Sequence, residues 1–421
     1  MTLLFLPFAL LAAQAVPSID PALARRYLTE AQRSCAADGG RLWGVSLCGP
    51  ILLVDPLTRR VAANRRDAQG LLSAEDGLWA GRLPEDQMTA NTALEWAGER
   101  WTLLLWPLPE NPWQRRALVL HESWRRIQDR IGLPARAAAN SHLDEMEARV
   151  WLQLEWRALR AAVTGFGERK ARAAGDAIAF RRRRHALYAN AAVEEQTLEL
   201  SEGLAEYTGL RLSSESDAEA AERAARKLDA APREATFVRS FAYATGAAYG
   251  LLLDAANHGW QRRLRPSDDL AELLALAMGL DGLGADVRAG LYGANELRIA
   301  ETRRQKQRQE RLRRYRERLV EGAVLLLPLE NPRISFDPAT LLPLPGHGLI
   351  YPEMQVSDAW GDLTVTNGAL LSPDSKRLTV PAPAGTASPL AGDGWRLRLR
   401  PGWRAVRGAR TGDFALAPGL E

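Results

Sequence analysis

The chain has little of several features that identify common protein classes. It has two cysteines in 421 residues, and its net charge is +4, from 55 basic and 51 acidic residues. So small a charge excess gives little support for nucleic-acid binding. Beyond the amino terminus no stretch approaches the roughly twenty apolar residues of a membrane span, so we expect no span in the mature protein. No serine-hydrolase elbow, phosphate loop, dinucleotide fingerprint or calcium loop is present.

The amino terminus is typical of a secretory signal. Residues 1–15 combine a short apolar run with a final Ala-Gln-Ala, the small-x-small pattern that signal peptidase cleaves. The pattern predicts cleavage after Ala15 and a periplasmic or secreted protein. Cys35 and Cys48 lie thirteen positions apart and suit a disulfide in an oxidising compartment; two buried free thiols are the alternative.

A helix expected from about residue 112 carries the most informative motif. Asn111 can cap this helix, and the proline after it suits a first turn. His121 is followed by Glu122, and Arg125 lies one turn later on the same face. In the HExxH helix of zinc peptidases a second histidine stands at the position of Arg125. A guanidinium stays protonated and offers no lone pair, so Arg125 cannot serve as that ligand.

A second helix, expected over 191–207, carries a stripe of four carboxylates. Asn190 can cap it and Gly209 can end it. The spacing of i, i+4, i+7 and i+11 places four glutamates on one face, namely Glu195, Glu199, Glu202 and Glu206. Like charges at this spacing destabilise a helix, so the stripe predicts that a cation or metal faces it.

These two helices carry a resemblance to a known family. Residues 201–206 resemble the glutamate helix of the gluzincin metallopeptidases, and the His121 segment resembles their HExxH helix. The resemblance implies that His121 is the first zinc ligand, Glu122 the general base and Glu202 the third ligand. It also implies that metal-activated water hydrolyses a peptide bond. Further segments, at 42–50, 154–159, 240–246 and 393–397, resemble an uncharacterised group of secreted bacterial proteins whose HExxH motif is intact. This resemblance spans most of the mature chain.

The arginine at the second ligand position leaves two outcomes open. Arg125 can pair with Glu202 and fill the former metal position, which predicts an inactive pseudopeptidase that binds a peptide or partner protein. Alternatively, another donor completes the zinc site; the candidates are His142, Asp144, His185, Glu199 and Glu206. Tyr243 and Tyr249 are candidate oxyanion donors, with close helix packing by their small neighbours as the alternative.

The expected fold class is α+β. Short strands indicate a β-rich region over 16–109, which we expect to form an antiparallel sheet. Helical patterns indicate a metallopeptidase-like domain over 110–321, and frequent proline, glycine and strands indicate an all-β module over 322–421. The arginine runs at 181–184 and 303–314 are predicted to be solvated helix faces, not contacts to phosphate.

Overall fold

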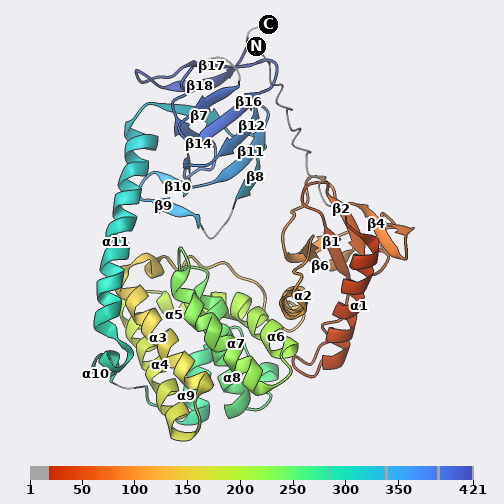
Figure 1. Cartoon of the computed structure of the whole chain (residues 1–421), viewed down its shortest axis with the longest axis vertical. Coiled ribbons are helices and arrows are strands. Elements are labelled where there is room, and N and C mark those ends of the chain that lie inside the picture. The colour runs from red at the N-terminus through yellow and green to blue at the C-terminus, as the bar shows by residue number, and fades with distance from the viewer. Residues whose placement is uncertain (1–18, 283, 337–339, 386–388, 420–421) are drawn as a thin grey trace, which may run out of the picture. The chain divides into compact units, whose positions relative to one another are not determined.

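The computed structural model describes residues 19–282, 284–336, 340–385 and 389–419 (Figure 1). The predicted signal segment lies outside these residues. The chain has an α+β fold and forms two compact units. The first contains residues up to 140, 155–231 and 241–288, and the second contains 141–154, 232–240 and 289–421. The expected boundary near 110 is not a division between units, because the amino-terminal sheet and most of the helices belong to the first unit.

The first unit begins with a helix and a six-stranded sheet. Helix α1 (Pro21–Asp38) is capped by Asp20. The strand order is β3-β4-β2-β1-β6-β5. The strand bounds are β1 (Ile51–Val54), β2 (Arg60–Ala63), β3 (Ser73–Glu75), β4 (Leu78–Arg82), β5 (Thr92–Trp96) and β6 (Glu99–Leu105). Strand β1 runs parallel to β6 and the other neighbours are antiparallel, so the expected all-antiparallel sheet is wrong.

Both faces of the central strands are buried. Leu53 and Leu104 pack with α1 on one face, whereas Leu52 and Leu103 pack in a separate cluster on the other. This follows from the alternation of side chains along a strand. The segment 42–47 is a turn and loop. Cys48, at its end, forms the expected disulfide with Cys35 on α1.

Helix α2 (Pro112–Ile127) begins where the sequence predicts. The Asn111 side chain accepts a hydrogen bond from the backbone N–H of Gln114 at 3.1 Å. Leu120, Trp124 and Ile127 are fully buried and form the apolar stripe of α2. The stripe fixes the rotation of α2, and with it the direction in which the neighbouring polar positions point.

The remaining helices of the first unit follow the predicted helical pattern, apart from one interruption. Their bounds are α3 (Met146–Thr164, from residue 155 onward), α4 (Gly167–Leu187), α5 (Ala191–Leu198), α6 (Leu204–Ser213), α7 (Asp217–Ala230), α8 (Phe241–Ala256), α9 (Leu270–Met278) and α10 (Ala285–Arg288). A π-helical turn, η2 (Glu199–Gly203), joins α5 to α6. Gly209 was expected to end the helix, but it lies inside α6, which continues to Ser213.

Three glycines allow the helices around α6 to approach closely. A Cβ on Gly209 would lie 2.5 Å from the carbonyl oxygen of Ala117 on α2. A Cβ on Gly246 of α8 would lie 2.4 Å from the Cα of Gly203. Only glycine fits at such contacts, so these residues bring α2 and α8 against the η2–α6 segment.

The second unit contains a long helix and a two-sheet module. Its helical segments are η1 (Ser141–Asp144), the beginning of α3, η5 (Ala289–Tyr292), α11 (Ala294–Arg316) and the π-helical η6 (Glu317–Glu321). The strand orders are β17-β18-β7-β14-β13-β10-β9 and β15-β16-β12-β11-β8. The bounds are β7 (Val324–Pro328), β8 (Arg333–Phe336), β9 (Leu342–Leu344), β10 (Gly348–Tyr351), β11 (Met354–Asp358), β12 (Gly361–Val365), β13 (Ala369–Leu371), β14 (Arg377–Pro381), β15 (Leu390–Gly392), β16 (Trp395–Leu399), β17 (Trp403–Arg407) and β18 (Phe414–Pro418).

The core of the carboxy-terminal module contains residues from both of its sheets. Leu327 and Leu378 come from the seven-stranded sheet, and Val356 and Leu397 come from the five-stranded sheet. Across the described ranges, no helix is both long and apolar enough to cross a membrane.

Candidate functional site

The faces of α2 and η2–α6 that carry His121 and Glu202 meet inside the first unit. His121 Nε2 lies 3.7 Å from Glu202 Oε2, and His121 Nδ1 lies 3.3 Å from Glu206 Oε2. The side chains of His121 and Glu202 are 9% and 2% exposed. The close contact at Gly209 explains how α2 and α6 come near enough for these contacts. The structure thus brings together the two motifs that the sequence singles out.

Arg125 binds the carboxylate that the resemblance assigns to the metal. Its Nη1 donates a hydrogen bond to Glu202 Oε1 at 2.5 Å. The other oxygen of Glu202 accepts a hydrogen bond from the Tyr243 hydroxyl at 2.8 Å. Burial alone would lower the pKa of Arg125, but the carboxylates of Glu202 and Glu122 outweigh it and raise the pKa above its usual value. Arg125 is therefore a fixed positive charge at the second ligand position.

His121 lies among acceptors, not beside a second histidine. Burial alone would lower its pKa, but the carboxylates of Glu202 and Glu206 outweigh it and raise the pKa to about 9. The imidazole is consequently protonated at neutral pH, and both ring nitrogens are donors. Its ring also stacks on Tyr243, with centroids 5.9 Å apart and planes 11° apart.

Lys227 of α7 completes the site, and the sequence analysis missed it. Its Nζ lies 2.5 Å from Glu206 Oε1, so Glu206 bridges Lys227 and His121. Burial would raise the pKa of Glu206, but Lys227 and His121 lower it to about 2. Nothing in the sequence around Lys227 marks it, because a single lysine on an amphipathic helix is ordinary.

Glu122 is buried beside this group of charges. One of its oxygens lies 3.9 Å from His121 Nε2, and the other, Oε2, has no hydrogen-bond partner among the described residues. Burial raises the pKa of Glu122, and the positive charges of His121 and Arg125 oppose that rise. We define the α2–α6 charge cluster as three carboxylates and three cations: Glu122, Glu202, Glu206, His121, Arg125 and Lys227. Fully ionised, the cluster has no net charge.

The residues of this cluster do not fit zinc. Zinc bound to Glu202 would share that carboxylate with the guanidinium of Arg125, and the two positive centres would repel each other. The carboxylates around His121 favour its protonated form, with Nδ1 lying 3.3 Å from Glu206 Oε2, whereas a zinc ligand must offer a lone pair. Within the described part of the chain, no group of three or more His, Cys, Asp or Glu side chains is arranged to hold a metal.

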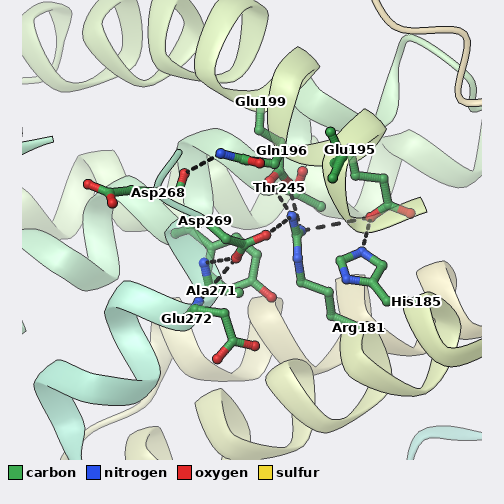
Figure 2. A network of polar contacts seen from close by, with 12 residues as sticks. Arg181, His185, Glu195, Gln196, Glu199, Thr245, Asp268, Asp269, Ala271 and Glu272 are labelled. Atoms are coloured by element: carbon green, nitrogen blue, oxygen red, sulfur yellow. Dashed lines mark hydrogen bonds and ion pairs between the residues drawn. The ribbon is translucent and has the colours of Figure 1, made fainter. Parts of the chain in front are cut away.

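The predicted carboxylate stripe is divided between two places. Glu195 on α5 and Glu199 on η2 face arginines of α4 (Figure 2), whereas Glu202 pairs with Arg125 of α2. Arg181 Nη1 donates to Glu199 Oε1 at 2.9 Å, and Arg184 Nε donates to Glu195 Oε1 at 2.7 Å. Glu199 is therefore no substitute zinc ligand.

The same contacts correct the prediction for residues 181–184. Arg181 and Arg184 are 1% and 0% exposed, so this face of the run is buried, not solvated. Figure 2 shows Arg181 among the labelled carboxylates Glu195, Glu199 and Asp269. Arg181 also pairs with Asp269 at 3.0 Å, and Arg184 pairs with Glu155 at 2.6 Å. Burial raises the pKa of Glu199 to about 7, although Arg181 opposes the rise.

The other residues proposed from the sequence lie elsewhere. The Tyr249 hydroxyl donates to Glu155 at 2.7 Å, so Tyr249 belongs to the Arg181 network and is no oxyanion donor beside His121. His185 Nε2 lies 3.0 Å from Glu195. His142 and Asp144 lie on η1 of the second unit. Among the tyrosine and substitute-ligand candidates, Glu206 belongs to the α2–α6 charge cluster and Tyr243 contacts it.

A cavity of about 810 Å³ lies among α3, α7 and α8 in the first unit. Its wall includes the apolar side chains of Ala221 and Leu251. Basic and acidic groups also line it, among them Lys170, Arg211 and Asp254. Such a lining suits a ligand that has both apolar and charged parts.

Comparisons of the chain with protein-family models, with curated proteins and with solved structures find no match.

Proposed function

We propose that the chain is an exported pseudopeptidase: a gluzincin-like protein that binds a peptide or protein segment and does not hydrolyse it. The observation that carries the proposal is the 2.5 Å hydrogen bond from Arg125 to Glu202. It supports the first of the two outcomes that the altered motif leaves open. The disulfide between Cys35 and Cys48 is consistent with export.

The charge balance of the α2–α6 charge cluster supports the loss of catalysis. Three buried or half-buried carboxylates are matched by three cations of the protein itself, so no further positive charge is needed. A dication would have to displace Arg125 and take a proton from His121. Removing one partner of a buried ion pair is costly, because the other charge stays buried and unpaired.

The binding role rests on the cavity of about 810 Å³. Its volume is within the range of about 300 to 1,000 Å³ that is usual for ligand pockets. Arg211 on α6 and Asp254 on α8 line the cavity. Helix α6 directly follows the turn that carries Glu202, the partner of Arg125, and α8 carries Tyr243, which donates a hydrogen bond to Glu202. We infer that the α2–α6 charge cluster fixes the helices that form the cavity wall.

A peptide-display experiment tests the proposal. The full-length mature protein is used to select from a library of random dodecapeptides, and selected peptides are then incubated with it and analysed by mass spectrometry. We expect enrichment of peptides with apolar and charged residues, and we expect them to stay intact. Ala221→Trp should abolish the enrichment by filling the cavity. Ala230→Trp is the matched control, because Ala230 is exposed on the same helix and does not line the cavity.

Two results would contradict the proposal. Equal enrichment by the Ala221→Trp and Ala230→Trp proteins would show that the cavity does not bind the peptides. Cleavage of peptides that depends on bound zinc and is lost in Glu122→Gln would show a metallopeptidase, with Glu122 as its general base.

A further inference from the structure

A second cavity, of about 380 Å³, lies in the second unit and is lined mainly by arginines. It lies among the segment 233–237, the end of η1, the beginning of α3, and α11. The arginines that line it are Arg149, Arg233, Arg304, Arg308 and Arg311. Two carboxylates, Asp144 and Glu234, line it as well. Five positive and two negative side chains give the lining a net charge of +3.

The α11 arginines come from the run that the sequence analysis assigned to a solvated face. Arg304, Arg308 and Arg311 follow the i, i+4, i+7 spacing and therefore share one face of the helix. The prediction is wrong for this face, because Arg304 and Arg308 are half-buried and all three line the cavity. Burial lowers the pKa of Arg304, and the nearby charges of Arg149 and Arg308 lower it further against the effect of Glu301.

Three of the five guanidinium groups are held in place by the protein. Arg149 donates to Glu301 at 2.5 Å and to Gln305 at 2.9 Å. Arg304 donates to backbone carbonyls of the 232–235 segment and lies over the Phe237 ring, 4.4 Å from its centroid. Arg308 pairs with Asp144 at 2.8 Å. Groups fixed in this way lose little conformational entropy when a ligand binds.

The lining still has donors that the protein does not use. Arg233 and Arg311 are exposed, and neither makes a side-chain hydrogen bond or ion pair with the described residues. The Nε of Arg308 is buried and also has no hydrogen-bond partner among them. A buried donor without a partner costs free energy, and so does the mutual repulsion of crowded cations. A bound anion would relieve both.

We propose that this cavity binds a small anion with a phosphate or sulfate group. Guanidinium groups form paired, charge-assisted hydrogen bonds with such tetrahedral oxyanions. The proposal rests on residues of the second unit alone, so it is independent of the pseudopeptidase proposal. Arg233 and Arg311 would bind the outer oxygens of the anion, while Arg304 and Arg308 would face its inner side.

Calorimetric titration of the full-length protein with inorganic pyrophosphate tests the proposal. We expect one binding site per chain and an affinity that falls about tenfold in Arg311→Ala and in Arg233→Ala, the loss expected for one charge-assisted hydrogen bond. Arg303→Ala and Arg314→Ala are matched controls, because these arginines are exposed on the same helix and do not line the cavity. They should bind pyrophosphate within about twofold of the unmodified protein. Glu234→Gln should tighten binding, because it removes a repelling carboxylate from the lining.

A parallel titration with a sulfated disaccharide distinguishes the two sources of the anion. Tighter binding of either probe supports the proposal and identifies the preferred group. The proposal would be overturned if neither probe binds. An equal loss in Arg311→Ala and Arg303→Ala would also overturn it, because only the overall charge of α11 would then matter. Because Arg311 is exposed, we expect Arg311→Ala to fold normally, so that misfolding does not explain a loss of binding. An unchanged thermal melting curve of this variant checks that expectation.

Discussion

Arg125 and Glu202 are joined by a 2.5 Å hydrogen bond at the place where the HExxH resemblance puts a metal ion. Glu202 accepts a second hydrogen bond from Tyr243, so both of its oxygens are used by the protein itself. A metal ion in a gluzincin-like site would link α2 to the glutamate helix. Here the guanidinium group of Arg125 makes that link, and it holds the two helices together without a metal ion.

Zinc binding should depend on residue 125. We expect the unmodified protein to contain no stoichiometric zinc, and Arg125→His to create a site that also requires His121 and Glu202. The substitution removes a fixed charge and adds an imidazole, which restores three ligands with an open position. Elemental analysis and competitive zinc titration measure the effect. Arg125→Gln is the control, since it removes the charge without adding a ligand. One zinc per chain in the unmodified protein, lost in His121→Ala, would contradict the prediction.

Loss of the Arg125 charge should destabilise the first unit. Arg125→Met leaves Glu202 buried beside Glu122 and Glu206, and we expect the free energy of unfolding to fall by about 3 kcal/mol, as for other broken buried ion pairs. Denaturant titration followed by circular dichroism measures this change. The double variant Arg125→Met/Glu202→Gln should recover part of the loss, because the unpaired charge is gone. A double variant no more stable than Arg125→Met would show that the arginine acts through packing alone.

Stability should fall as pH rises above neutrality. The pKa of His121 is raised from 6.5 to about 9, so the folded protein binds this proton more tightly than the unfolded chain. The stabilisation is fully present below pH 6.5 and is lost as pH rises through 9, with a total of about 3 kcal/mol by linkage. Unfolding free energies between pH 6 and 10 measure it. The unfolding free energy of His121→Gln should depend less on pH over that window. An equal pH dependence in the two proteins would argue against a raised pKa of His121 in the folded state.

The contact between α2 and α6 should not tolerate a methyl group. We expect Gly209→Ala to cost about 1 to 3 kcal/mol, because the new Cβ would lie 2.5 Å from the Ala117 carbonyl oxygen. Gly175→Ala on α4 is the control. Its Cβ would lie 4.0 Å from Leu280, an ordinary contact, and alanine is favoured over glycine within a helix, so this variant should be as stable or slightly more stable. Thermal unfolding of both proteins decides the point.

Local signals in the sequence predicted much of the site. The Asn111 cap and the apolar positions of α2 indicate where the helix begins and which side it buries, and the pairing of Arg125 with Glu202 was one of the two outcomes that the altered motif left open. The predictions that were wrong concern residues whose partners are distant in the sequence. The burial of Arg181 depends on Glu155 and Asp269, which come from other helices, and no local pattern distinguishes it from a solvated arginine. The sequence did not predict the π-helical turn either, because the turn changes the backbone conformation and leaves the spacing of the glutamates along the sequence unchanged.

That turn has a consequence for how the helix is used. Successive residues of an α-helix are rotated by about 100° around its axis, and a π-helical turn adds about one residue to the winding. Glu195 and Glu199 are thereby out of phase with Glu202 and Glu206, and one continuous helical segment serves two separate groups of cations. Deletion of a single residue between Glu199 and Gly203 would bring the two halves back into register, and one pair of carboxylates would then face away from its arginine.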